Sequence, residues 1–331
     1  MNKFVQVLQF WFNSARGYSI PISIMSWSVP FIFGLTDGGN LFYGILAFFG
    51  IVSVHLGVNL FDDVIDYYLE KRQISKGLKE SFDFQKGKCK YIVDGKASAL
   101  KTLFVSLGLF AFSSAIGLFL AYECGIQVII LIALAAILCL LYPVLTYFAM
   151  GEVIVGILFA PMLYYGTYFV MTKSFSPEIM VISISTGLLT IGLLHTHTLM
   201  DYDFDVKNNK KTLSSLAGSK KNAVIVQGVI MFLAYLNILA GIYFNFLPMI
   251  MLLSLLSIPT SVSLYNLLML HAKDPNIVVP RRFWMGPMEN WETFVKNNTE
   301  SFMIKFLLAR NVMLVFTVLI CIAKIASEFI G

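Results

Sequence analysis

Residues 41–66 read LFYGILAFFGIVSVHLGVNLFDDVID, an apolar run that ends in a group of oxygen-bearing side chains. A membrane-crossing helix needs about 20 mostly apolar residues, and residues 41–61 supply them. The polar side chains that follow are spaced i, i+3, i+4 and i+7, so they share one helical face: Asn59, Asp62, Asp63 and Asp66. The stretch predicts a membrane helix with an acidic face at one end.

The composition of the whole chain agrees with this stretch. Of 331 residues, 58% are hydrophobic and 13% are charged, against about 25% charged in a soluble domain. The mean hydropathy is +0.78. This composition excludes a disordered or fibrous chain, a nucleic-acid-binding protein and an ordinary soluble enzyme. It predicts an all-α, polytopic membrane protein.

Apolar runs of membrane-spanning length recur along the chain. We expect nine transmembrane helices, at residues 18–36, 41–61, 98–121, 125–147, 151–172, 178–199, 222–244, 247–270 and 305–328. Three polar connections are long, at 67–97, 202–221 and 271–304. We interpret residues 1–331 as a single transmembrane domain.

The basic residues orient these spans. With the N-terminus in the cytoplasm, 22 of the 24 Lys and Arg fall on the cytoplasmic side, and only Lys173 and Lys324 fall outside it. This asymmetry is that of the positive-inside rule. The first 17 residues lack the small-residue cleavage site of a secretory signal, so we expect the first span to be retained.

A second acidic group closes the sixth expected span. His197, Asp201 and Asp205 are spaced i, i+4 and i+8, while Asp203 points to another side and is expected to be solvated. Both groups end even-numbered spans, so they are expected on the same face of the membrane. Their placement, four helices apart, predicts two four-helix halves related by an axis along the membrane normal, with a ninth helix appended.

Acidic side chains at a membrane edge are costly, so a functional interpretation is the default. Carboxylates on one face repel one another at low dielectric and are stabilised by a cation. Mg²⁺ prefers a few carboxylates together with waters and phosphate oxygens, whereas thiolate-poor ligands argue against zinc. The four cysteines are scattered and form no metal-binding pair. The two groups therefore predict Mg²⁺ ions that hold a diphosphate.

At these residues the sequence resembles the UbiA superfamily of intramembrane prenyltransferases, most closely its 1,4-dihydroxy-2-naphthoate polyprenyltransferase branch. The first motif of that branch, NxxNDxxD, matches residues 59–66 with Asp62 in place of Asn. The second, DxxxD followed by GKxT, matches residues 201–212 with Asn209 in place of Gly. Residues 16–21 (RGYSIP) resemble the RPxTLP start of the first helix, residues 151–170 resemble the fifth helix, and residues 90–96 match a basic, Gly-containing segment before the third.

The resemblance implies Mg²⁺-dependent transfer of a polyprenyl group from a prenyl diphosphate to an aromatic acceptor. The first choice of acceptor is 1,4-dihydroxy-2-naphthoate, in menaquinone biosynthesis. It implies two Mg²⁺ ions, one at each motif. The expected metal ligands are Asp62, Asp63, Asp66, Asp201 and Asp205. The expected substrate-binding residues are Arg16, Asn59, Lys88, Lys90, His197, Lys210 and Thr212.

Catalysis is expected to depend on Asp63, Asp66 and Asp201, with Asp66 and Asp201 as alternatives for the group that deprotonates the acceptor hydroxyl. Lysines act as point charges on phosphate, and Lys210 is the first choice. His197, one turn before Asp201, either orients that carboxylate or packs between helices. The expected location is an integral, multi-pass protein of the inner cell membrane, with its active site on the cytoplasmic side.

Several alternatives stay open at this stage. The acceptor can instead be 4-hydroxybenzoate, homogentisate, a porphyrin or a lipid alcohol, because His197-Thr198 replaces paired Asn and residues 271–304 have no counterpart in the branch. A cation-coupled secondary transporter is disfavoured, since transporter sites lie at the midplane and these acids lie at one edge. The lipid bilayer is the expected partner, and no nucleic acid is. The sequence leaves the prenyl chain length and the oligomeric state undetermined.

Overall fold

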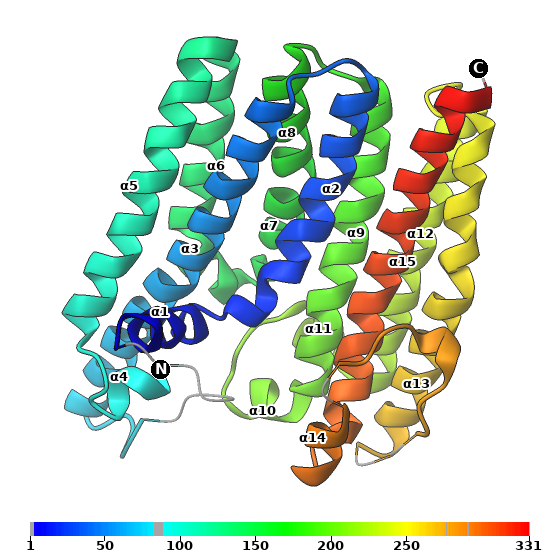
Figure 1. The fold of residues 1–331 in the computed structure, drawn as a ribbon. Coiled ribbons are helices and arrows are strands. Elements are labelled where there is room, and N and C mark those ends of the chain that lie inside the picture. Colours follow the sequence, from blue (N-terminus) through cyan, green and yellow to red (C-terminus); the bar gives the residue numbers. More distant parts are fainter. Residues whose placement is uncertain (1–2, 83–88, 276, 278, 290, 331) are drawn as a thin grey trace. The chain divides into compact units, whose positions relative to one another are not determined.

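A computed structural model describes residues 3–82, 89–275, 277, 279–289 and 291–330, and every regular element in these residues is a helix. The chain divides into two compact units. One comprises Met1–Ile24 and Ile45–Ile132, and the other comprises Met25–Gly44 and Ala133–Gly331. Figure 1 labels the helices of both units in chain order.

The expected membrane spans are helical. In the described residues, eight helical segments are long and apolar enough to cross a membrane: Gly17–Thr36, Leu41–Ser75, Ala99–Cys124, Gly151–Thr172, Pro177–Met200, Lys220–Tyr243, Met249–Lys273 and Glu300–Phe329. The expected span at 125–147 is the helix α6 (Ile126–Leu145), whose apolar part Ile126–Tyr142 is shorter. The protein is a multi-pass integral membrane protein. The count of nine, the two-halves arrangement and the side of the N-terminus stay predictions.

In the first unit, two long helices pack through small residues. These are α3 (Leu41–Ser75) and α5 (Ala99–Cys124) (Figure 1). Ser106 Oγ donates to Gly57 O at 2.8 Å, and Ser113 Oγ donates to Gly50 O at 3.0 Å. Glycines on one membrane helix allow the other to approach closely, and the serines satisfy their hydroxyls on its backbone. This packing fixes the helix that carries the first acidic motif.

Helix α3 is longer than the sequence predicted. The apolar run ends near Phe61, but the helix continues through the acidic residues to Ser75. Residues 62–75 contain no glycine or proline, so nothing in them stops a helix once it leaves the membrane. The expected connection 67–97 is therefore partly helical: it holds the end of α3 and the short helix α4 (Lys90–Val93).

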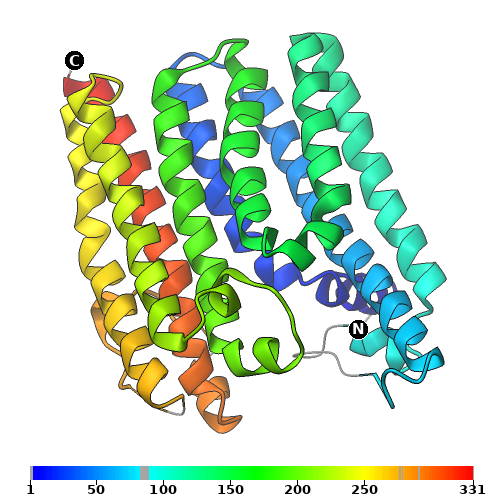
Figure 2. The same cartoon turned by 180° about the vertical axis from the view of Figure 1, so that it is seen from behind.

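In the second unit, α9 (Pro177–Met200) packs along α12 (Lys220–Tyr243), as Figure 2 shows from behind. Ser185 Oγ donates to Ala234 O at 2.8 Å, and Asn237 Nδ2 donates to Val181 O at 2.7 Å. Polar side chains that bond across two membrane helices hold them in register. Nearer the C-terminal end of α9, where the second motif begins, His195 Nε2 lies 2.8 Å from Ala223 O of α12.

The span Gly151–Thr172 is not one regular helix. It consists of α7 (Gly151–Ile157), the π-helical turn η4 (Leu158–Met162) and α8 (Leu163–Thr172). Pro161 lies in that turn, and a proline ring does not fit the hydrogen-bond ladder of a regular helix interior. Gly156 lies so close to α9 that an added Cβ would be 3.0 Å from Gly187 O. Helix α7 thus approaches α9 closely and brings Glu152 to it.

The connection 271–304 is folded onto the last helix. It contains η6 (Phe283–Met285) and α14 (Trp291–Lys296), and α15 (Glu300–Ile330) begins before the expected residue 305. Asn311 Nδ2 donates to Met285 O at 2.7 Å, and Arg310 Nη2 donates to Pro287 O at 2.8 Å. These bonds attach the described part of the connection to α15.

Candidate active site

In the first unit, one arginine contacts two of the carboxylates on the acidic face of α3 (Asn59, Asp62, Asp63 and Asp66). Arg16 forms an ion pair with the buried Asp63, and its Nη2 lies 3.6 Å from Asp62 Oδ2. Arg16 adopts the left-handed conformation, with φ at 58°, at the corner between α1 (Lys3–Ser14) and η1 (Gly17–Ser19). A non-glycine residue in that conformation carries strain, which the carboxylate contacts offset.

Neighbouring groups hold this corner against α3. Asn59 Nδ2 donates to Ala15 O at 3.0 Å, and Cys89 Sγ donates to Asp63 O at 3.2 Å. The Tyr91 hydroxyl is buried with no hydrogen-bond partner among the described residues. Burial, and beyond it the charge of Asp63, raise the pKa of Tyr91. Cys89 and Tyr91 were not among the expected site residues, although Tyr91 lies in the segment 90–96 that resembles the family's basic, Gly-containing segment.

Three further residues were expected at this site: Asp66, Lys88 and Lys90. Asp66 follows Asp63 on the same helix and is half-buried. Lys90 is exposed at the start of α4. Lys88 lies outside the described residues.

In the second unit, Asp201 lies where two helices meet. The spacing of the second motif predicted one continuous helix, but α9 ends at Met200 and α10 begins at Tyr202 and ends at Lys207. That expectation was wrong at Asp201, whose φ of −96° and ψ of 10° are not helical. His197 Nδ1 nevertheless lies 3.5 Å from Asp201 Oδ2, as the i, i+4 spacing predicted, and its ring meets Phe302 and Phe306 edge to face.

Asp205 is the most buried carboxylate of this group. Its side chain is fully buried, with Lys210 Nζ 3.4 Å from Oδ1, while Oδ2 has no hydrogen-bond partner among the described residues. Burial raises the pKa of Asp205, and the Lys210 charge opposes that rise. Asp203, in contrast, is 76% exposed and pairs with Lys220, in agreement with its expected solvation.

Asn209, directly before Lys210, is one departure from the family motif, and its backbone conformation explains it. Asn209 stands where the motif has Gly, and its φ is 53°. Asparagine tolerates the left-handed conformation better than other non-glycine residues do. At this turn the backbone N–H of Lys210 donates to Asp205 O at 2.8 Å. The turn thereby brings the Lys210 side chain beside the Asp205 carboxylate.

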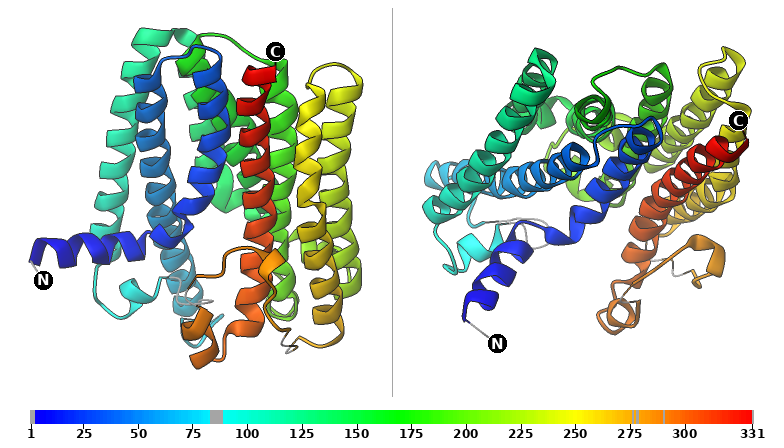
Figure 3. Two further views of the ribbon diagram at one scale, coloured as in Figure 1. Left: turned by 45° about the vertical axis from the view of Figure 1, so that its right-hand side comes forward. Right: turned by 45° about the horizontal axis from the view of Figure 1, so that its top comes forward.

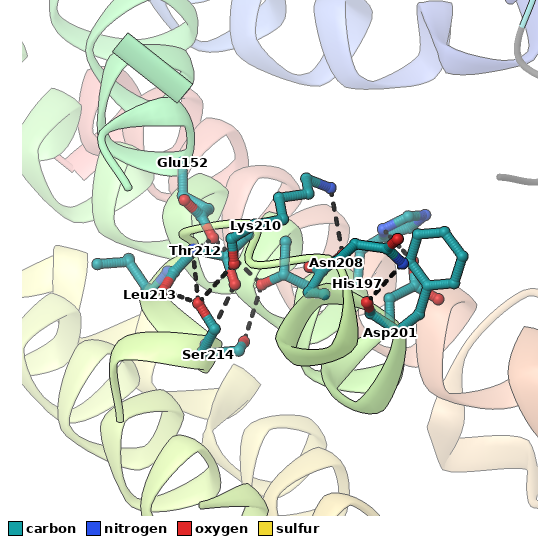
Figure 4. Close-up of polar contacts among 12 residues, drawn as sticks. Glu152, His197, Asp201, Asn208, Lys210, Thr212, Leu213 and Ser214 are labelled. Carbon is teal, nitrogen blue, oxygen red and sulfur yellow. Dashed lines mark hydrogen bonds and ion pairs between the residues drawn. The ribbon is translucent and has the colours of Figure 1, made fainter. Parts of the chain in front are cut away.

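A buried glutamate of α7 holds the loop that follows (Figure 4). Glu152 Oε1 accepts hydrogen bonds from Thr198 Oγ1 at 3.1 Å and from Leu213 N at 3.2 Å. Ser214 Oγ extends this network to Thr198 Oγ1 at 2.8 Å. The sequence offered one signal for Glu152, a charge at the first turn of an apolar span, where an acid is costly unless it has a function.

Thr212, an expected site residue, and His195, two residues before His197, both have structural contacts here. Thr212 caps α11 (Leu213–Leu216): its hydroxyl accepts from Ser215 N at 3.1 Å. His195 is buried, with Nε2 2.8 Å from Ala223 O. It therefore faces away from Asp201 and does not form a metal-binding pair with His197.

The donor chemistry of both clusters fits magnesium. Among the described residues, no three His, Cys, Asp or Glu side chains converge into a complete metal cage. Mg²⁺ is usually bound through one or two carboxylates together with waters and substrate phosphates, so a full protein cage is not required. The buried, unpartnered Oδ2 of Asp205 is the atom that most clearly calls for a cation.

Comparison with known proteins agrees with these features. The chain matches the UbiA prenyltransferase family over residues 23–285. A digeranylgeranylglyceryl phosphate synthase structure is 16% identical, with a TM-score of 0.63, and the match covers 96% of this chain and 99% of that one. A UbiA homologue from Aeropyrum pernix K1 is 15% identical, with a TM-score of 0.58 and coverages of 92% and 98%.

A third solved structure adds a bound state. A UbiA homologue from Archaeoglobus fulgidus bound to GPP and Mg²⁺ is 15% identical, with a TM-score of 0.55, and the match covers 92% of this chain and 99% of that one. At these identities the structural likeness establishes the fold alone. A comparison with curated protein sequences found no match.

The fold is that of a polytopic membrane protein with acidic residues at the ends of two helices. The family match extends over most of the chain, and the chain belongs to the UbiA prenyltransferase family. Its members are prenyltransferases, so this protein is a prenyltransferase.

Proposed function

We propose that this protein transfers a polyprenyl group from a prenyl diphosphate to an aromatic acceptor in a Mg²⁺-dependent reaction. The observation that carries the proposal is the state of Asp205, a fully buried carboxylate with Lys210 on one oxygen and no partner among the described residues on the other. A buried carboxylate in this state is costly unless a second cation is the partner of its other oxygen. The structure of a family homologue with GPP, a prenyl diphosphate, and Mg²⁺ supports the choice of ligand.

In this proposal, Asp62, Asp63 and Asp66 hold one Mg²⁺, and Asp201 and Asp205 hold a second. When bound, Mg²⁺ stabilises the negative charge that develops on the departing diphosphate. The carboxylate ligands hold the ions, and so determine where the diphosphate lies. Substitutions in each cluster test whether prenyl transfer depends on both.

The cationic side chains of the two clusters bind the diphosphate directly. Lys210, half-exposed beside Asp205, supplies a point charge for a phosphate oxygen. Arg16 lies against Asp62 and Asp63, and in this proposal its guanidinium also binds a phosphate oxygen. Asn59 donates to Ala15 O, directly before Arg16, and so holds Arg16 in place. In this proposal Asn59 affects diphosphate binding through Arg16.

The carbon–oxygen bond to the diphosphate breaks, and a ring carbon of the acceptor forms the new bond to the allylic carbon. The acceptor hydroxyl gives its proton to Asp66 or Asp201. After the new bond forms, the hydrogen of the attacked ring carbon leaves as a proton and the hydroxyl oxygen is reprotonated, so the ring is aromatic again. His197, 3.5 Å from Asp201, orients that carboxylate. Thr212 contributes by capping α11, which supports the loop that carries Lys210.

We further propose 1,4-dihydroxy-2-naphthoate as the acceptor and menaquinone biosynthesis as the setting. The likeness of residues 151–170 to the fifth helix of that branch supports this choice. The distribution of basic residues supports a cytoplasmic active site and a cytoplasmic N-terminus. The homologous digeranylgeranylglyceryl phosphate synthase makes a lipid alcohol the main competing class of acceptor.

The experiment measures prenyl transfer by the full chain, purified and reconstituted in phospholipid vesicles. A radiolabelled prenyl diphosphate is supplied with 1,4-dihydroxy-2-naphthoate, 4-hydroxybenzoate, homogentisate, a porphyrin or a glyceryl phosphate ether, with Mg²⁺ or with EDTA. We expect labelled product with the naphthoate in Mg²⁺ and none in EDTA.

The outcomes separate the levels of the proposal. Product with another acceptor would overturn the choice of naphthoate and keep the reaction class. Product of equal yield in EDTA would overturn the role of Mg²⁺. If no acceptor in the panel were prenylated by folded protein, the proposed aromatic prenyl transfer would be wrong.

A further inference from the structure

A histidine lies inside the apolar run of α3 and belongs to neither acidic motif. His55 comes one turn before Asn59, and residues 44–58 contain no other ionisable side chain. Ionisable side chains within membrane-spanning segments are rare, and a functional interpretation is the default. The hydrogen-bond partners of His55 therefore indicate what it does.

His55 extends the stripe of α3 that holds the corner after α1. His55, Asn59 and Asp63 follow one another at i, i+4 and i+8, so they share one helical face. The side chains of Asn59 and Asp63 both bind residues of the corner 15–19. His55 binds the same corner one turn deeper, with Nε2 3.0 Å from Ser19 Oγ. Figure 3 shows α1 lying across the long axis of α3, so the chain turns at this corner.

The directions of the hydrogen bonds around His55 follow from the hydrogens available. Ser19 has one hydroxyl hydrogen, and it donates this hydrogen to Arg16 O at 2.7 Å. The Ser19 oxygen must therefore accept from His55, so Nε2 of the ring carries a hydrogen. A positive charge on a ring within a membrane span is costly, so the ring is neutral. In the neutral ring Nδ1 is an acceptor, and Ser23 Oγ donates to it at 2.6 Å.

The relay from Ser23 through His55 to Ser19 ends on the carbonyl of Arg16. That carbonyl also accepts from Ser19 N at 2.8 Å, so two hydrogen bonds from one residue hold it. Holding the carbonyl fixes ψ of Arg16, which is 44° in the left-handed region. This conformation is costly for a residue other than glycine and persists only where its surroundings hold it. The relay thereby keeps the guanidinium beside Asp63.

We propose that His55 is a positioning residue for diphosphate binding. As the Nε2–H tautomer it orients Ser19, whose hydroxyl holds the Arg16 backbone in the conformation that presents the guanidinium to the substrate. This role rests on the proposed function, in which Arg16 binds a phosphate oxygen of the prenyl diphosphate. The functional face of α3 thus extends one turn beyond the first motif, into the apolar run.

The first measurement is the affinity of the full chain, in phospholipid nanodiscs, for inorganic diphosphate with Mg²⁺. His55→Leu removes both ring nitrogens, and we expect its Kd to rise about fivefold to tenfold. His55→Gln keeps an N–H that can donate to Ser19, and its Kd should stay within about twofold of the wild-type value. Ser53→Ala is the matched control, because it removes a hydroxyl that bonds within α3, to Phe49 O, and should leave Kd unchanged.

Double variants test whether His55 acts through Ser19 and Arg16. Ser19→Ala should raise Kd as much as His55→Leu does, and the two changes combined should be no worse than either alone, because they break one relay. In an Arg16→Ala background, His55→Leu should have no further effect. In prenyl transfer, His55→Leu should raise the KM for the prenyl diphosphate and leave kcat and the KM for the acceptor unchanged. Thermal unfolding shows that each variant is folded.

Nitrogen-15 NMR of histidine-labelled protein in nanodiscs detects the tautomer itself. The signals that disappear in His55→Gln belong to His55. We expect a hydrogen on its Nε2 and none on its Nδ1. A hydrogen on Nδ1 would overturn the relay.

The outcomes of the binding measurements separate this role from the proposed function. A folded wild-type chain that binds no magnesium diphosphate would overturn both. Wild-type binding together with an unchanged Kd in His55→Leu would overturn the role of His55 alone. Equal losses in His55→Leu and His55→Gln, or losses that add to those of Ser19→Ala, would overturn it as well.

Discussion

The backbone N–H of Leu213 donates to Oε1 of Glu152 at 3.2 Å, so a buried carboxylate near the start of one membrane-spanning segment holds the loop that follows Lys210. The same oxygen accepts from Thr198 Oγ1, one residue after His197. Glu152 therefore touches both chain segments that flank the Asp201–Asp205 motif. We expect it to act as a positioning residue of the second cluster.

The first prediction tests this role of Glu152. Glu152→Ala leaves Leu213 N and Thr198 Oγ1 without their acceptor, so the loop that presents Lys210 loses its anchor. We expect kcat/KM for prenyl transfer to fall by about 10- to 100-fold, as expected for a misplaced positioning group. Glu152→Gln keeps an acceptor oxygen and should recover most of the activity. If Ala and Gln variants had equal activity close to that of the wild type, Glu152 would not position the loop.

The second prediction concerns the cation at the acidic face of α3. Arg16→Ala removes the cation that pairs with the buried Asp63 and lies beside the buried Asp62, which costs on the order of 3 kcal/mol of unfolding free energy. A bound Mg²⁺ replaces the lost charge, so the shift of the melting temperature on adding Mg²⁺ should be larger in this variant than in the wild type. Thermal unfolding in detergent, with and without Mg²⁺, measures both effects.

A surface pair provides the control for Arg16. Lys96 lies 3.7 Å from Asp94 and is largely exposed, so Lys96→Ala should change neither the stability nor the Mg²⁺ response. An Mg²⁺ shift of the Arg16→Ala variant no larger than that of the Lys96→Ala variant would contradict a metal site at Asp62 and Asp63.

The third prediction concerns the turn at Asn209, which places Lys210 beside Asp205. Asn209 has a φ of 53°, which glycine adopts freely and a branched residue does not. Asn209→Gly should retain activity, whereas Asn209→Val should lose stability by about 1–2 kcal/mol and lower the affinity for the prenyl diphosphate. Equal KM values for the Gly and Val variants would show that this turn does not place Lys210.

The fourth prediction compares two glycines of one span. An added Cβ at Gly156 would lie 2.5 Å from Ile191 and 3.0 Å from Gly187 O, and the backbone oxygen cannot move aside cheaply. Gly156→Ala should cost about 1–3 kcal/mol. Nothing lies within 4 Å of an added Cβ at Gly166, so Gly166→Ala should be neutral or stabilising. Thermal unfolding of the two variants in detergent gives the comparison, and an order opposite to this one would show that α7 and α9 are not closely packed.

The membrane helices could be predicted from the sequence because a bilayer imposes one condition, a run of about 20 apolar residues. The spans expected at 98–121 and 178–199, for example, needed no tertiary information and are the helices at 99–124 and 177–200. The acidic clusters could be singled out for a related reason. Carboxylates such as Asp62, Asp63 and Asp66 are costly at the edge of a membrane, so their presence there indicates a functional site.

Local features of the site depended on tertiary contacts and could not be predicted. The extension of α3 to Ser75 follows helix propensity after the apolar signal has ended. The break at Asp201 is absent from the periodicity, because the residues on both sides are helical. The partners of Asp63 and Leu213 are Arg16 and Glu152, which lie 47 and 61 positions away in the sequence. No spacing rule connects residues at such separations.

The central claim is that the acidic clusters bind the magnesium diphosphate of the substrate, and two aspartates two residues apart test it most directly. Asp201 lies beside His197 in the motif, while Asp203 is exposed and pairs with Lys220. Mg²⁺-dependent release of diphosphate from a prenyl diphosphate is measured for Asp201→Asn and Asp203→Asn in vesicles. We predict a loss of about 100-fold or more for Asp201→Asn and wild-type turnover for Asp203→Asn. Full turnover by the Asp201→Asn variant, or equal losses in both, would contradict the claim.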